Sequence, residues 1–78
     1  MSSVIKTPLP GTFYRRPSPD ADPYVQEGDS VEAGDVVGLI EIMKTFHEVI
    51  SDVEGVVERF LADDAALVDV GQELLALE

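Results

Sequence analysis

The chain has 78 residues and no cysteine, and its sixteen acidic and five basic side chains give a net charge of −11. This length allows one small domain, and the lack of cysteine excludes a disulfide scaffold or a thiolate metal cluster. The charge argues against binding to nucleic acid or to an anionic membrane, since both need basic patches. The apolar content of 45% is too high for disorder, so we expect a single folded domain over residues 1–78.

Short β-strand patterns separated by turn residues run along the chain. Turn signals fall at residues 8–11, 27–29, 33–35, 51–52 and 70–72. Strand patterns lie between them at 36–43, 45–50, 55–61 and 73–78. The composition of 73–78 also allows helix, as does that of 61–68, where the repeat described next disfavours it. Short strands with frequent turns predict an all-β sandwich or barrel.

The chain repeats itself. Residues 31–41 match residues 68–78 at an offset of 37, whereas the glycines that open the two units, Gly11 and Gly55, lie 44 residues apart. The first unit therefore carries about seven extra residues before Val25. Neither unit can bury its apolar face alone. We predict a flattened β-barrel or sandwich of two four-stranded halves with pseudo-two-fold symmetry.

The extra residues fall in a proline-rich segment, residues 16–23, which we call the thumb. Proline donates no backbone hydrogen bond, so this segment cannot lie inside a sheet ladder. We expect it to protrude as a loop from one of two otherwise equivalent halves. A proline-stiffened turn is its ordinary role. Its backbone groups and one hydroxyl are available for hydrogen bonding in Pro17, Ser18, Pro19, Asp20, Ala21, Asp22 and Pro23.

The midpoint of the repeat lies in a β-like run of 15 residues, 36–50, whereas a typical strand has about 5–6. A chain this short must fold the run back as a hairpin, with its bend near Met43 and Lys44. Neither residue is the Gly, Asn or Asp that tight hairpin turns prefer, and such local violations concentrate at functional sites. A solvated turn lysine and a core methionine are the ordinary alternatives.

The sequence at this bend resembles the biotin-attachment motif of biotinyl domains, the carrier domains of biotin-dependent carboxylases. Their usual motif is Ala-Met-Lys-Met after an acidic residue; this chain keeps Glu41, Met43 and Lys44 but has Ile42 and Thr45 in place of the Ala and the second Met. Residues 11–21 resemble the thumb region found in carriers of the acetyl-CoA carboxylase type. The resemblance covers roughly residues 5–78 and implies the hammerhead-type fold shared with lipoyl domains.

The resemblance implies that a biotin protein ligase joins biotin to Lys44 through an amide bond. The lysine side chain and its biotin then form a long flexible arm. This arm carries CO₂ from a biotin carboxylase to a carboxyltransferase, for the conversion of acetyl-CoA to malonyl-CoA in fatty acid synthesis. The domain itself is expected to contribute tethering rather than catalysis. We expect Met43 to serve the carboxylases, Glu41 to discourage wrong partners, Thr45 to flank the site, and the thumb to contact the biotin ring.

Two alternatives remain open. A lipoyl-type carrier shares the fold, but lipoyl domains usually have Asp where this chain has Met43. An unmodified biotinyl-like interaction module is the other, because Ile42 and Thr45 depart from the motif. An independent enzyme is the weakest hypothesis, since no nucleophile–base pair, metal cluster or phosphate-binding loop is present in the sequence.

Some further expectations concern location and neighbouring side chains. No apolar run reaches the length of a membrane span and the first residues lack a secretory signal pattern, so we expect a cytoplasmic protein. Phe46 and Val49 are expected in the core and His47 on a strand surface. The remaining acidic pairs are expected to be solvated loop residues: Asp20 with Asp22, and Asp63 with Asp64.

Overall fold

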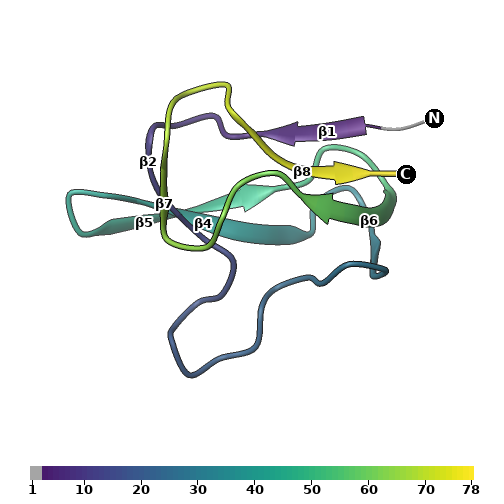
Figure 1. Cartoon of the computed structure of the whole chain (residues 1–78), viewed down its shortest axis with the longest axis horizontal. Helices are drawn as coiled ribbons and strands as arrows, with labels where there is room; N and C mark the ends of the chain where they lie inside the picture. Colours follow the sequence, from purple (N-terminus) through teal and green to yellow (C-terminus); the bar gives the residue numbers. More distant parts are fainter. Residues whose placement is uncertain (1–2) are drawn as a thin grey trace.

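The computed structural model describes residues 3–78, which consist of strands and loops without a helix (Figure 1). The eight strands are β1 (Ser3–Lys6), β2 (Gly11–Tyr14), β3 (Ser30–Val31), β4 (Val36–Ile42), β5 (Thr45–Ile50), β6 (Gly55–Phe60), β7 (Ala66–Val68) and β8 (Glu73–Leu77). The predicted all-β fold is confirmed. The two segments whose composition allows helix instead contribute the strands β7 and β8.

Two antiparallel four-stranded sheets form the molecule, in the orders β1-β8-β6-β3 and β5-β4-β2-β7. The offset of 37 residues relates β4 to β8, each of which lies inside its sheet, and relates β3 to β7, each of which lies at an edge. The pseudo-two-fold relation is thus confirmed. The two sheets are not the two sequence units, however, because each sheet takes two strands from each unit. The units interleave, and a single shared core results.

Backbone hydrogen bonds repeat at the same offsets. The Gly28 amide donates to the Val57 carbonyl at 2.8 Å, and the Ala65 amide, 37 residues later, donates to the Phe13 carbonyl at 2.7 Å. Two buried hydroxyls 44 residues apart behave alike: Thr7 and Ser51 each donate to the carbonyl two residues ahead. The repeat inferred from sequence therefore holds at the level of individual backbone groups.

The core lies between the sheets and draws on both of them. Its largest fully buried side chains are Phe13, Ile40, Leu74, Leu75 and Leu77. Val49 is buried, as predicted, but Phe46 is 55% exposed, so its assignment to the core is wrong. Side chains alternate between the two faces of a strand. Phe46 and Val49 are three residues apart on β5, so they point to opposite faces and only Val49 faces the core.

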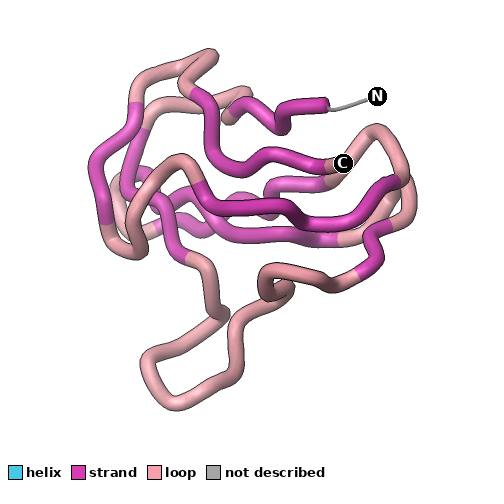
Figure 2. The backbone as a smooth tube through the Cα atoms, turned by 45° about the vertical axis from the view of Figure 1, so that its right-hand side comes forward, coloured by secondary structure: helices cyan, strands magenta, loops and turns pink. Residues whose placement is uncertain are grey.

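The thumb leaves the body as a protruding loop between β2 and β3, blue at the bottom of Figure 1 and clear again in Figure 2. No strand occurs between Tyr14 and Ser30, so the predicted loop is confirmed. At its base the Tyr24 amide donates to the Arg15 carbonyl at 2.9 Å, and near its tip the Ala21 amide donates to the Ser18 carbonyl at 3.1 Å. These bonds give the loop a defined shape.

Candidate functional site

The bend of the β4–β5 hairpin is a two-residue turn. Ile42 pairs with Thr45, which leaves Met43 and Lys44 as the loop, with φ angles of 49° and 66°. Positive φ at both positions is the signature of a type I′ turn. For residues with a Cβ this conformation costs about 1–2 kcal/mol each. The predicted bend is confirmed, and the two residues are held there against their local preference.

The turn presents its side chains to solvent at one end of the molecule. Met43 is 92% exposed, which rules out its alternative role as a core residue, and Lys44 and Thr45 are also exposed. The tip lies at the far left of Figure 1, opposite the C-terminal end of β8, along an axis 35 Å long. A primary amine is therefore displayed where a large partner can reach it.

Three side chains cluster on the outer face of the sheet beside this tip. The Tyr14 hydroxyl donates to Glu41 Oε1 at 3.2 Å, and this hydrogen bond to the carboxylate raises the pKa of Tyr14 above its usual range. The rings of Tyr14 and Phe46 lie 6.3 Å apart at 51°. Glu41 is half-buried. His47 is exposed on β5, as predicted.

A cavity of about 250 Å³ separates the thumb from this face, lined by Tyr14, Arg16, Pro17, Ser18, Pro19, Phe46 and Asp64. The structure thus brings three predicted thumb residues, Pro17 to Pro19, beside the hairpin. Asp20 and Asp22 are exposed and line none of the hollows described here. The Ala21 carbonyl accepts a hydrogen bond from Arg16 Nη1 at 3.3 Å, so Ala21 acts within the thumb.

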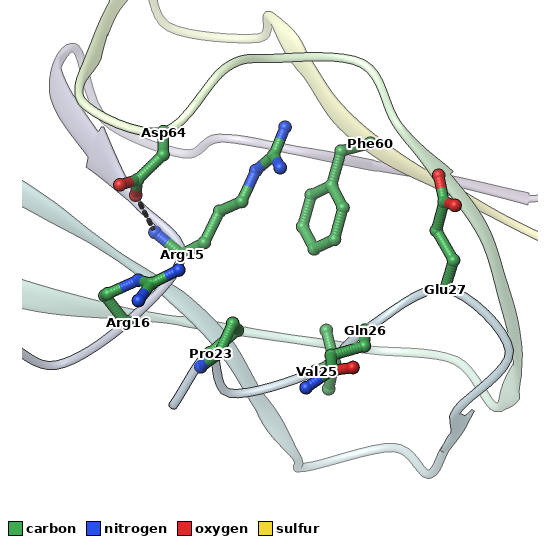
Figure 3. A pocket seen from close by; sticks show the side chains of 8 residues that line it. All are labelled: Arg15, Arg16, Pro23, Val25, Gln26, Glu27, Phe60 and Asp64. Atoms are coloured by element: carbon green, nitrogen blue, oxygen red, sulfur yellow. Dashed lines mark hydrogen bonds between the residues drawn. The ribbon is translucent and has the colours of Figure 1, made fainter. Parts of the chain in front are cut away.

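A larger hollow of about 540 Å³ lies at the base of the thumb, lined by Arg15, Arg16, Pro23, Val25, Gln26, Glu27, Phe60 and Asp64 (Figure 3). The Arg15 guanidinium lies 4.1 Å from the centre of the Phe60 ring and donates to the Ala62 carbonyl at 2.9 Å. Asp64 accepts a 2.7 Å hydrogen bond from the Arg15 amide. Asp64 is exposed in a loop, as predicted, and its carboxylate also anchors the base of the thumb.

Sequence reasoning missed several residues of this site, chiefly Tyr14, Arg15 and Asp64, and misplaced Phe46. For Asp64 the available signal was the repeat, since it occupies the position equivalent to Glu27 at the offset of 37. Tyr14 and Arg15 lie within residues 11–21, the segment that resembles the thumb region. Across residues 3–78, no group of three potential metal-ligating side chains comes together. No helix of the described chain is long and apolar enough to span a membrane.

Comparisons with known proteins agree with this geometry. The family described as biotin-requiring enzyme, which comprises biotin and lipoyl domains, matches residues 3–77. The biotin carboxyl carrier protein of acetyl-CoA carboxylase from Haemophilus influenzae is 37% identical over 75 residues, 96% of this chain and 48% of that protein. The chloroplastic protein of the same name from Glycine max is 39% identical over 74 residues, 95% of this chain and 28% of that protein.

Among solved structures, the urea carboxylase of Kluyveromyces lactis matches with a TM-score of 0.79 and 27% identity, over 100% of this chain and 6% of that chain. The chain spans about half, or less, of the curated relatives named above. The family match over residues 3–77 spans the strands of both sheets and the β4–β5 hairpin. The chain therefore belongs to the biotin and lipoyl domain family of biotin-requiring enzymes.

Proposed function

We propose that this chain is a biotin carboxyl carrier domain, comprising residues 1–78, with biotin joined through an amide bond to the amine of Lys44. The observation that carries the proposal is the position of Lys44 at an exposed, two-residue hairpin turn in a chain of this family. The domain is non-catalytic and acts by presenting its arm to other active sites.

The residues around the turn suit this attachment. Acylation needs an exposed amine on a defined backbone, and a type I′ turn between two paired strands supplies both. Met43 and Thr45 flank Lys44 on the exposed surface, and Glu41, near the end of β4, accepts a hydrogen bond from Tyr14. The cavity under the thumb has aromatic and proline walls next to the hairpin, which suits an apolar bicyclic ring.

Biotin, once attached, supplies a ureido nitrogen that carries CO₂ as a carboxylate. The chain contributes the tether, which raises the local concentration of the arm at each partner site. We infer a biotin protein ligase, a biotin carboxylase and a carboxyltransferase as the partners, with acetyl-CoA as acceptor and malonyl-CoA as product for fatty acid synthesis in the cytoplasm. Support for acetyl-CoA comes from relatives named as carriers of acetyl-CoA carboxylase.

The test is the intact mass of the chain co-expressed with a biotin protein ligase and free biotin. We expect a gain of one biotinyl group, its complete loss in Lys44→Arg, and no change in Lys6→Arg, which replaces the other lysine of the chain. Circular dichroism establishes that each variant is folded. A folded wild-type chain without the added mass contradicts the proposal, and lipoylation with a lipoyl ligase is then the next measurement.

A further inference from the structure

The cavity beneath the thumb contains a cationic side chain with unused hydrogen-bonding capacity. We propose that Arg16 is the carboxylate-binding group of this cavity, so that the cavity accepts an arm on residue 44 that ends in a carboxylate in preference to the same arm with a neutral end. The inference rests on the proposed function, because the carried CO₂ is such a carboxylate. It assigns to the thumb a preference for the loaded arm over the empty one.

The first observation concerns the donors of Arg16. Its Nη1 donates to the Ala21 carbonyl at 3.3 Å, which fixes the guanidinium within the thumb. Its Nε is buried and has no hydrogen-bond partner. Unpaired buried donors are rare in folded proteins and call for a partner. The Nε and Nη2 edge of a guanidinium forms two parallel hydrogen bonds with a carboxylate, so a carboxylate satisfies both donors of Arg16 at once.

The second observation is the setting of this donor. The cavity walls include two aromatic rings and two prolines. These apolar walls make the surroundings of Arg16 less polar than bulk water, which strengthens a charged hydrogen bond. Phe46 in the wall lies two residues after Lys44, about 7 Å along the strand, so an arm longer than a lysine side chain can fold back into the cavity.

The charge distribution gives the third observation. With a net charge of −11, most of this surface repels an anionic arm. Asp64 also lines the cavity, but its Oδ1 accepts the Arg15 amide at 2.7 Å. Asp64 reduces the local positive field, so the preference depends on the directed donors of Arg16 as well as on its charge. A neutral arm would gain little from those donors.

The direct test uses the absence of cysteine from the chain. Lys44→Cys creates a unique thiol, which is alkylated with two arms of equal length that end in a carboxylate or a primary amide. The readout is the ¹⁵N–¹H resonance of Arg16 Nε, assigned by its loss in Arg16→Lys. We expect the carboxylate arm to shift this resonance and the amide arm to leave it nearly unchanged, with about tenfold higher occupancy for the carboxylate. Equal shifts from the two arms, or no shift, would overturn the proposal.

A second measurement follows the loaded natural arm. The biotinylated chain is loaded with labelled bicarbonate by a biotin carboxylase and ATP, isolated, and followed as the label is lost. In that loss the bond between the ureido nitrogen and the carboxylate carbon breaks, CO₂ leaves, and the nitrogen takes a proton from water. We expect loss to be severalfold faster in Arg16→Gln, intermediate in Arg16→Lys, and unchanged in Arg59→Gln, whose side chain is exposed on β6.

The two measurements separate the possible failures. If Lys44 takes no biotin, the proposed function fails while the cysteine-linked arms still report on Arg16. If biotin is attached but Arg16→Gln and Arg59→Gln lose the label at the same rate, the proposed function stands and the assignment of Arg16 is wrong.

Discussion

Two connections in this molecule begin and end alike and differ in one respect. The link from β2 to β3 and the link from β6 to β7 occupy equivalent places in the repeat, and each buries one side chain against the core, Val25 in the first and Ala62 in the second. Counted between repeat-equivalent positions, at the offsets of 44 and 37, the first link is longer by about seven residues, which lie in the thumb. The strands and links that the two units share therefore determine the fold, whereas the added residues create the cavity beside the hairpin.

The longer link also depends on the shorter one. Asp64, in the short link, accepts the Arg15 amide at the base of the thumb, and the carbonyl of Ala62 accepts the Arg15 guanidinium. An insertion in one unit is thus anchored by the other unit. The anchoring residues of the short link lie beside the base of the thumb because the two units interleave in both sheets.

The core shows a matching difference between the units. Phe13 packs against Gly38 in one unit, and the equivalent positions in the other hold Val57 and Leu75. A Cβ added at Gly38 would lie 2.6 Å from Cε1 of Phe13 and 3.0 Å from the Tyr14 carbonyl. In the first unit a large side chain on β2 packs against a glycine on β4. In the second unit the equivalent positions hold a smaller side chain on β6 and a larger one on β8.

The largest expected effect comes from breaking this pairing. Gly38→Ala should lower the free energy of unfolding by about 1–3 kcal/mol through overpacking, as measured by urea denaturation. In the Phe13→Val background the same change should cost about 1 kcal/mol less, because the ring that clashes is gone. Strict additivity of the two substitutions would show that the ring and the glycine are independent.

An intermediate effect is expected where the two links turn. Gly28 has φ of +93° with open space around an added Cβ, and its counterpart Ala65 has φ of 66°. Gly28→Ala should therefore lose about 1–2 kcal/mol from backbone strain alone. Ala65→Gly should gain up to about 1 kcal/mol as strain is relieved, offset by glycine's greater unfolded-state entropy. Thermal unfolding of the matched pair checks the opposite signs.

The smallest effect on stability is expected from removing the thumb. Deleting residues 17–23 joins Arg16 to Tyr24 and removes the seven residues by which the first link exceeds the second between repeat-equivalent positions. Shortening an exposed loop changes closure entropy only slightly, so the free energy of unfolding should move by less than about 1 kcal/mol. Circular dichroism and biotinylation at Lys44 test the variant. Loss of folding in this variant would mean that the thumb is required for the two-sheet fold.

The sequence by itself determined much of this protein. Alternating apolar residues, turn residues and the internal repeat predict eight short strands in two related sets, the bend at Met43 and Lys44, and the proline-rich loop. These features follow from the conformational preferences of individual residues and from the periodicity of apolar residues, both of which depend only on residues close together in the sequence. The position of Lys44, which we propose as the attachment site, at the midpoint of the repeat follows from the same patterns, and the proposal also draws on the resemblance of its motif.

Only the tertiary structure decided which faces meet. The bond between the Arg15 amide and Asp64 joins residues 49 apart in sequence, and that between Tyr14 and Glu41 joins residues 27 apart. Phe46 lies on the outer face because pairing across the strands assigns each alternate side chain to a side. The cavity around Arg16 exists because the thumb folds over that face, and no local pattern encodes the packing of a loop against a distant strand.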